Sequence, residues 1–143
     1  MSIDFKHELG QYTLFDPQQT TVVYLAIVNR HREKDIDEII DHTYNPICIQ
    51  ISNSTKPVIC YVNGVAAGAG ANLALACDIT LAAKTAKFIQ SFINIGLVPD
   101  TGGTYYLPRI IGRQKAMGLM FSGEKITAQE AGQALEVASK YLV

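Results

Sequence analysis

The sequence has no tryptophan, few cysteines and little charge. Three of its 143 residues are Cys, and 17% are charged, against a usual share of about 25%. Cys48, Cys60 and Cys77 form no C-x-x-C pair, which argues against a disulfide scaffold or a four-cysteine zinc site and fits a reducing cytoplasm. Lys and Arg total 12 and Asp and Glu total 13, so the net charge of −1 gives no general attraction to nucleic acid or to a membrane surface. We therefore expect a cytoplasmic protein with neither partner.

Long hydrophobic runs are also scarce, and the one candidate is a poor membrane span. The stretch from Pro57 to Cys77 is uncharged and nominally long enough to cross a bilayer. It contains Asn63, Asn72 and three glycines, so we expect it to be buried in protein rather than in lipid. Met1–Glu8 carries charges where a secretory signal is apolar, so no export signal is expected. With 48% apolar residues and no low-complexity linker, residues 1–143 are expected to form a single core domain.

Hydrophobic patterning predicts an α/β fold. Two apolar runs, 57–62 and 79–83, flank a short helical segment at 72–77, and a strand, a tight crossover and a second strand imply parallel pairing. Thr127 and Glu130 have the spacing of a capping box, so a terminal helix is expected beyond them. The other expected elements are a strand at 21–28, a helix at 35–42 that Pro46 interrupts and that resumes to about Ser52, a glycine and alanine turn at 64–70, a loop-rich segment after Phe88, and a helix at 113–121.

The most distinctive segment is the small-residue turn Gly64–Asn72, between a strand and a helix. Glycine lets successive N–H groups aim the same way, and the first N–H groups of a helix lack intrahelical partners. Such a turn can hold an anion or stabilise negative charge on a carbonyl oxygen, but close packing of helix on strand explains the same residues equally well. A dinucleotide fingerprint is not favoured, because Leu73 stands where the third glycine would be. The sequence also contains no P-loop and no G-x-S-x-G nucleophile elbow.

Asp100 is the second candidate for chemistry. It precedes Thr101-Gly102-Gly103, which is typical of a turn or a helix cap. The preceding segment 92–98 has no charge, and a carboxylate in apolar surroundings can have a raised pKa and transfer protons. The three histidines, at positions 7, 31 and 42, have no metal-ligand spacing, so no metal site is predicted. The cysteines are interpreted as small buried hydrophobic residues.

Several blocks of the sequence, in order and spacing, resemble the crotonase (enoyl-CoA hydratase/isomerase) superfamily over about residues 35 to 131. The blocks are Lys56–Gly64, Cys77–Ile79, Gly102–Thr104 and Leu107–Gly112. A further set, Tyr44-Asn45-Pro46, Phe92 and Gly96–Asp100, is similar to the phenylacetate-degradation branch, whose members isomerise a ring epoxide or a double bond on a CoA thioester.

The resemblance implies a spiral of ββα units, homotrimers often paired into hexamers, and an acyl-CoA thioester as substrate without a further cofactor. Ala69 matches the position whose backbone N–H is the second oxyanion donor, and Asp100 matches the catalytic carboxylate of the isomerases. The two glutamates of the hydratases fall on Asn72 and Phe92, so water addition by the usual route is not expected. Substrate contact is assigned to Gly64, Gly68, Gly70, Asn72 and Phe92.

The sequence departs from the superfamily in two places. The loop F-C/S-A-G-x-D, which carries the first oxyanion donor, is not found. Residues 21–34 have two possible interpretations. They are either the family's first strand and its Asn29-Arg30 turn, joined directly to the helix expected at Asp35, or the strand that normally precedes the missing oxyanion loop. Past Ala131, Leu135-Glu136-Val137 stands where the family has a tryptophan- or glycine-leucine-valine segment. The C-terminal helical region that covers the site in the family is not found in the sequence.

Two hypotheses about function therefore stay open. One is an acyl-CoA isomerase with an incomplete site and low or no activity as this chain. The other is an inactive crotonase-like protein that serves only assembly or binding.

Overall fold

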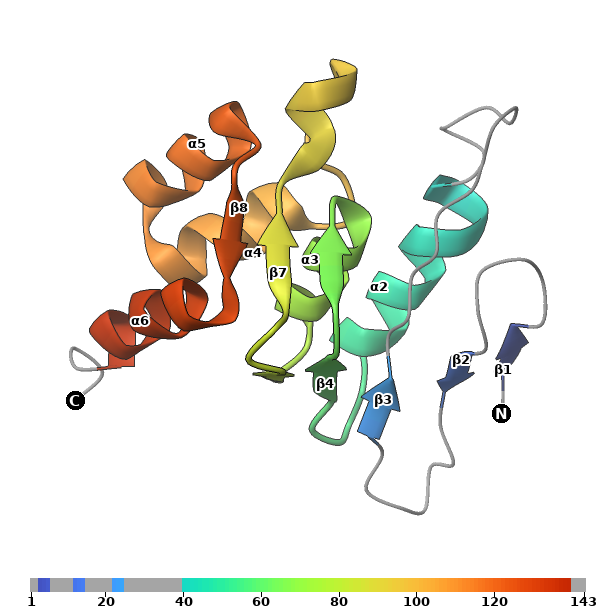
Figure 1. Cartoon of the computed structure of the whole chain (residues 1–143). Coiled ribbons are helices and arrows are strands. Elements are labelled where there is room, and N and C mark those ends of the chain that lie inside the picture. The colour runs from blue at the N-terminus through green and yellow to red at the C-terminus, as the bar shows by residue number, and fades with distance from the viewer. Residues whose placement is uncertain (1–2, 6–11, 15–21, 25–39, 140–143) are drawn as a thin grey trace.

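The structure, a computed structural model, describes residues 3–5, 12–14, 22–24 and 40–139, and it has the predicted α/β class (Figure 1). The strands are β1 (Ile3–Phe5), β2 (Tyr12–Leu14), β3 (Val22–Tyr24), β4 (Ile59–Val62), β5 (Val65–Ala67), β6 (Ile79–Ala82), β7 (Lys87–Ile89) and β8 (Lys125–Thr127). The helices are the π-helical turn η1 (Ile40–Tyr44), α2 (Asn45–Ser52), α3 (Ala69–Ala76), the 3-10 helix η2 (Ser91–Ile95), α4 (Gly103–Ile111), α5 (Arg113–Ser122) and α6 (Ala128–Ser139).

The chain repeats a ββα unit, and the units stack through their strands. β4 and β5 lead into α3, and β6 and β7 lead into η2 and α4. The first strands of the two units pair in parallel, with Ile59 opposite Ile79, and β3 pairs in parallel on the other edge of β4. The second strands, β5 and β7, also pair in parallel, and β8 joins β7 in antiparallel orientation. The expected spiral of ββα units is therefore confirmed for this part of the chain.

The two apolar runs predicted as strands are confirmed, with β4 beginning two residues later than expected. Asp78, which precedes β6, is hydrogen-bonded to Val58, which precedes β4. Its carboxylate accepts the Val58 N–H at 2.7 Å, and its own N–H donates to the Val58 carbonyl at 3.0 Å. The apolar side chains of β6 are not all covered: Ile79 is 48% exposed and Leu81 is 52% exposed. An uninterrupted apolar run therefore does not imply burial of both faces here.

Three sequence predictions in the middle of the chain were wrong in part. The turn expected at 64–70 contains the strand β5, and the helix expected at 72 already begins at Ala69. The loop-rich segment expected after Phe88 contains the 3-10 helix η2, and α4 follows it where no helix was predicted. A three-residue strand shows too little alternation to be detected, and Pro108 lies inside α4, where proline normally breaks a helix.

Predictions at the two ends of the chain have mixed outcomes. The capping box is confirmed, because Glu130 N–H donates to Thr127 Oγ1 at 3.2 Å and Thr127 N–H donates to Glu130 Oε2 at 2.7 Å. Pro46 does not interrupt a helix but lies in the first turn of α2, where its missing N–H costs least. The helix at 113–121 is confirmed as α5. Residues 25–28 and 35–39, parts of the predicted first strand and first helix, lie outside the described residues.

The main core lies between α2, β4 and α3. The buried members of this cluster are Tyr44, Ile51, Val58, Cys60, Val62, Leu73, Ala74, Cys77 and Ala86. A second cluster joins α4 and α5 through Leu107, Ala116 and Met120. The three thiols are free; Cys60 and Cys77 are buried and Cys48 is half-buried. None of the helices in the described ranges combines the length and apolar character that crossing a bilayer requires.

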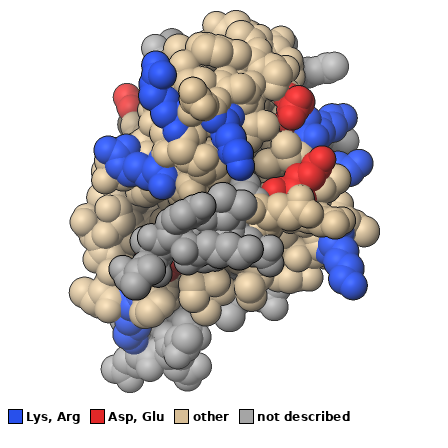
Figure 2. Space-filling view, turned by 90° about the vertical axis from the view of Figure 1, so that its left-hand side faces the viewer, with Lys and Arg blue, Asp and Glu red and all other residues tan. Residues whose placement is uncertain are grey.

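The charged side chains are dispersed on the face that carries α5 and α6. Figure 2 shows this face, where Lys and Arg side chains stand apart from one another with a few acidic groups between them. No continuous stripe of one sign is visible on that face. This face therefore offers individual charged residues and no extended charged surface.

Burial predicts which leucine stabilises the fold. Leu73→Ala removes a side chain that is 2% exposed, so we expect the free energy of unfolding to fall by about 2–5 kcal/mol in urea titrations. The same substitution at Leu81, which is 52% exposed, serves as the control and should cost less than about 1 kcal/mol. Equal losses for the two variants would contradict the assignment of the core to α3.

Candidate functional site

The N-terminal end of α3 is built by a glycine in a conformation that other residues rarely adopt. Gly68 has φ 53° and ψ −122°, its N–H donates to the Ile89 carbonyl at 2.9 Å, and its carbonyl accepts the Asn72 N–H at 3.1 Å. A Cβ at this position would lie 3.1 Å from Ser91 Oγ and 3.5 Å from Phe92 Cζ. Both the positive φ and the close packing thus require glycine.

The amide of Ala69, which follows Gly68, is accessible to a ligand. Within the described ranges, the N–H groups of Ala69, Gly70 and Ala71 donate to no carbonyl or side chain. Ala69 is partly accessible, whereas Gly70 and Ala71 are buried. The N-terminal end of a helix carries partial positive charge, so the Ala69 N–H can stabilise negative charge on an oxygen atom.

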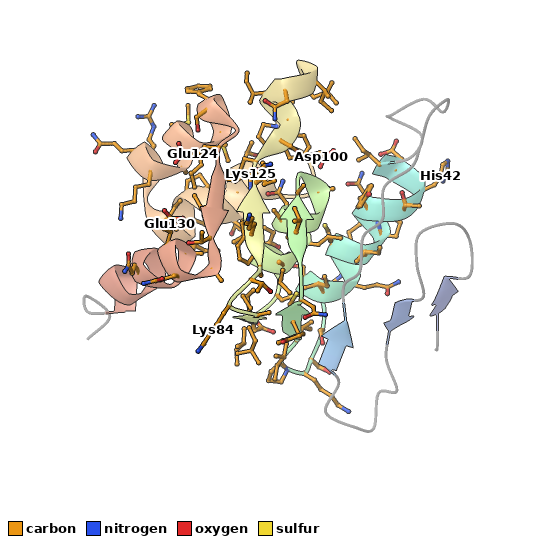
Figure 3. The ribbon with its side chains drawn as sticks, in the orientation of Figure 1. His42, Lys84, Asp100, Glu124, Lys125 and Glu130 are labelled. Carbon is orange, nitrogen blue, oxygen red and sulfur yellow. The ribbon has the colours of Figure 1, made fainter. Side chains whose placement is uncertain are left out.

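Asp100 lies above this end of α3, in the loop that leads into α4 (Figure 3). Its Oδ1 accepts the Thr101 hydroxyl at 2.7 Å, and its carbonyl accepts the Gly103 N–H at 2.8 Å. Thr101 is 4% exposed and has a φ of 51°, which is unfavourable for a β-branched residue. Strain of this kind, on the order of 1–3 kcal/mol, persists where the surrounding contacts fix the backbone.

A buried amide connects the Asp100 loop to α3. Asn72 is 0% exposed, its Nδ2 donates to the Asp100 carbonyl at 2.8 Å, and its Oδ1 accepts Gln90 Nε2 at 2.8 Å. Because a carbonyl can only accept, the first bond fixes the orientation of the Asn72 amide. Asn72 therefore uses both ends of its amide within the protein, and it positions the loop instead of facing a ligand.

Gly103 makes this connection sterically feasible. A Cβ at Gly103 would overlap the Asn72 side-chain amide. The first turn of α4 thus approaches α3 at a distance that only glycine allows. Glycine at position 103 and asparagine at position 72 are complementary parts of one contact.

The environment of Asp100 favours its protonated form. Burial raises the pKa of the Asp100 carboxyl above 3.8, and hydrogen bonds from Thr101 and from its own backbone N–H partly offset this effect. Burial, followed by the negative charge of Asp100, raises the pKa of the Tyr44 hydroxyl. The same two causes raise the pKa of the Cys48 thiol to about 11. A half-buried carboxyl with a raised pKa is a suitable group for moving protons.

The structure brings most of the predicted site residues together. Asn72 holds the Asp100 loop over the helix that begins at Ala69, and the Phe92 ring, 5% exposed, packs against Gly68. Gly70 lies in the first turn of the same helix. The fifth residue assigned to substrate contact, Gly64, is exposed at the other end of β5, where an added Cβ would meet nothing within 4 Å.

Sequence reasoning missed Gln90, Thr101 and Gly103. Gln90 is the one amide in the mostly apolar segment 88–93, which was a weak signal. Its hydrogen-bond partner, Asn72, is 18 residues away in the sequence. The positive φ of Thr101 has no signature in the sequence, because threonine is uncommon in that conformation. His42 is exposed, and among the described residues no three His, Cys, Asp or Glu side chains group as a metal site; the other two histidines lie outside these residues.

Comparisons with known proteins point to one family. Residues 26–135 match the family model for enoyl-CoA hydratase/isomerase. The chain is 50% identical to the 1,2-epoxyphenylacetyl-CoA isomerase of Escherichia coli K12 over 97 residues, which are 68% of this chain and 37% of that protein. It is 40% identical to the 2,3-dehydroadipyl-CoA hydratase of the same organism over 109 residues, 76% of this chain and 43% of that one.

Solved structures agree with the sequence comparison. An enoyl-CoA hydratase/isomerase from Cupriavidus metallidurans CH34 superposes with a TM-score of 0.63 at 41% identity, over 68% of this chain and 37% of that one. The described part of the chain therefore has the crotonase fold. The chain spans about two fifths of the length of the curated relatives it matches, 37% and 43% of the two named above.

The contact between Gly103 and Asn72 can be tested by adding one methyl group. Gly103→Ala should lower the free energy of unfolding by about 1–3 kcal/mol, because the new Cβ overlaps the buried amide. Gly118→Ala in α5 is the matched control: its Cβ meets nothing within 4 Å, so helix propensity should raise the stability by up to about 1 kcal/mol. If Gly103→Ala also stabilises the protein, the close approach of α4 to α3 does not exist in solution.

Asp100→Asn should make the protein more stable at neutral pH. The folded pKa of Asp100 is raised above 3.8, so the wild type is most stable with a protonated carboxyl and loses stability as the pH rises through the folded pKa. Asparagine keeps an oxygen for the Thr101 hydroxyl but cannot ionise. Urea titrations from pH 3 to pH 8 should show the variants diverging above the unfolded pKa, with the Asn variant the more stable. Parallel pH profiles would contradict the burial of the carboxyl.

Proposed function

Because the chain belongs to the enoyl-CoA hydratase/isomerase family, we propose that it binds an acyl-CoA thioester and moves a proton within the acyl group. The observation that carries the proposal is the placement of a half-buried carboxyl, Asp100, over the helix end whose first free N–H is that of Ala69. The Ala69 N–H can polarise a carbonyl, whereas the Asp100 carboxylate can take up a proton.

The proposed reaction uses the thioester oxygen and the carbon next to it. The Ala69 N–H donates to the thioester oxygen and, with the positive end of α3, stabilises the enolate that forms when a proton leaves the neighbouring carbon. Asp100, in its ionised form, accepts this proton and returns it to another carbon of the acyl group. The double bond shifts, no atom is gained or lost, and no cofactor takes part.

The side chains at two positions favour isomerisation over water addition. Asn72 and Phe92 cannot act as a general acid or base, and the Asn72 amide is occupied by Gln90 and by the Asp100 carbonyl. Asp100 is then the carboxyl available for proton transfer in this arrangement. The likeness to a 1,2-epoxyphenylacetyl-CoA isomerase supports an aryl-bearing acyl group and a role in phenylacetate degradation. A cytoplasmic location and a homo-oligomeric state belong to the same proposal.

A second candidate function is assembly without turnover. Apolar side chains are exposed on η2, the loop after it and α5: Ile95 is 68% exposed, Val98 81% and Phe121 67%. Such side chains favour contact with another protein surface. Because no reaction takes place, the second candidate requires no oxyanion donor.

Calorimetric titration with an acyl-CoA thioester, followed by a proton-exchange assay in deuterated buffer, separates the two candidates. We expect binding and exchange in the wild type, and a loss of exchange of about 10²–10⁴-fold in Asp100→Asn with binding retained. Asp78→Asn is the control, because Asp78 lies beyond the other end of α3 and an amide oxygen can still accept the Val58 N–H.

Each outcome of this experiment has a distinct meaning. No binding at millimolar thioester would overturn the proposal that this chain uses such a ligand. Binding without exchange in the wild type would favour assembly. Exchange that survives Asp100→Asn would remove Asp100 from the reaction.

A further inference from the structure

Thr101 has a backbone conformation that its own side chain disfavours. Within the described ranges it is the one residue other than glycine with a positive φ, at 51°, and every other positive φ there belongs to a glycine. The left-handed region is unfavourable for a β-branched side chain, whereas glycine adopts it freely. A glycine at position 101 would fit this backbone without strain, so the presence of threonine requires a specific explanation.

Contacts on both sides of Thr101 hold it in this conformation. The Asp100 carbonyl accepts the Gly103 N–H at 2.8 Å and Asn72 Nδ2 at 2.8 Å. Gly102 also has a positive φ, 74°, so two left-handed residues in succession lead the chain into α4. The backbone at position 101 is therefore fixed by its neighbours, and it sets the direction in which the Thr101 side chain leaves the chain.

The Thr101 side chain is buried and bonded to Asp100. It is 4% exposed, and its hydroxyl oxygen lies 2.7 Å from Oδ1 of Asp100. An ionised carboxylate can only accept, so the hydroxyl donates its single proton to Asp100 whenever Asp100 is charged. Hydrogen bonds of this charge-assisted kind are short and about twice as strong as those between neutral groups. Among the described residues, no other side chain donates to this carboxylate.

We propose that Thr101 is the positioning residue of Asp100, and that it keeps an unfavourable backbone conformation because its hydroxyl there orients the carboxylate and stabilises the ionised form. The role rests on the proposed function, in which ionised Asp100 takes up the proton. The backbone of Asp100 is held through its carbonyl, but its side chain could still rotate, and the bond to Thr101 restricts this rotation. Glycine at position 101 would relieve the strain and lose both effects.

The ionisable groups that the charge of Asp100 affects stay neutral while a carboxyl titrates. Burial, followed by this charge, raises the pKa of Tyr44 on η1 and raises that of Cys48 on α2 to about 11. On α4, burial raises the pKa of Tyr106 above 10, so this group is neutral over the same range. The helix α3 and the residue before η2 present uncharged amides. A change in the pKa of Asp100 on substitution at position 101 therefore reports on the local hydrogen bond.

The test is a carbon-13 NMR titration of the Asp100 carboxyl in the free protein, without thioester. Thr101→Val keeps the β-branched shape but removes the hydroxyl, so the pKa of Asp100 should rise by about 0.5–1 unit, a three- to tenfold change in its acid constant. Thr101→Ser is the matched control, because it keeps the hydroxyl and loses only a methyl group. This control should change the pKa of Asp100 by less than about 0.2 unit.

A role of Thr101 in packing alone would lower the unfolding temperature of both variants and leave the pKa of Asp100 unchanged, and this result would overturn the proposal. An equal rise of the pKa in Thr101→Ser would overturn it as well, because the hydroxyl would then not be the cause. If Thr101→Val does not fold, Thr101→Ala also lacks the hydroxyl and should show the same rise relative to Thr101→Ser. Because none of these measurements uses a thioester, failure here is distinct from failure of thioester binding.

Discussion

The side-chain amide of Asn72 holds together segments that are far apart in the sequence. It donates to the carbonyl of Asp100, 28 residues away, and accepts from Gln90, 18 residues away. In the fully buried environment of Asn72 an unpaired amide would cost on the order of 1–3 kcal/mol, so the bonds are mutually dependent. If the amide is displaced, the Asp100 loop loses its attachment to α3. The geometry of the whole site depends on this one group.

Several local features work against the stability of the fold at this point. Thr101 holds a positive φ, Asp100 is a half-buried carboxyl, and the buried Tyr44 hydroxyl has no hydrogen-bond partner among the described residues. Position 103 must be glycine, because a Cβ there would overlap the Asn72 amide. The core formed by α2, β4 and α3 stabilises the elements on which these residues lie. Unfavourable features of this kind concentrate where a protein binds or reacts.

The sequence predicted the elements with strong local signals. The apolar runs that became β4 and β6, their parallel pairing, the helix α5 and the capping box at Thr127 all follow from composition and spacing. β5 and η2 are too short for periodicity, and α4 contains Pro108, so local rules pointed to loops. Likewise Ala69 and Asp100 could be singled out, whereas the role of Gln90 depends on a contact between distant segments. Asn72 was expected to meet substrate, and only the structure shows that both ends of its amide are engaged within the protein.

In the proposed function, the N-terminal end of α3 receives the carbonyl oxygen of a thioester beneath Asp100. The most direct measurement is the backbone amide resonance of Ala69 during titration with an acyl-CoA thioester, compared with free coenzyme A. A hydrogen bond to the thioester oxygen should move the Ala69 proton downfield with the thioester and leave it in place with free coenzyme A. Saturable binding of the thioester that leaves the amides of residues 69–71 unchanged would show that this helix end does not hold the thioester oxygen.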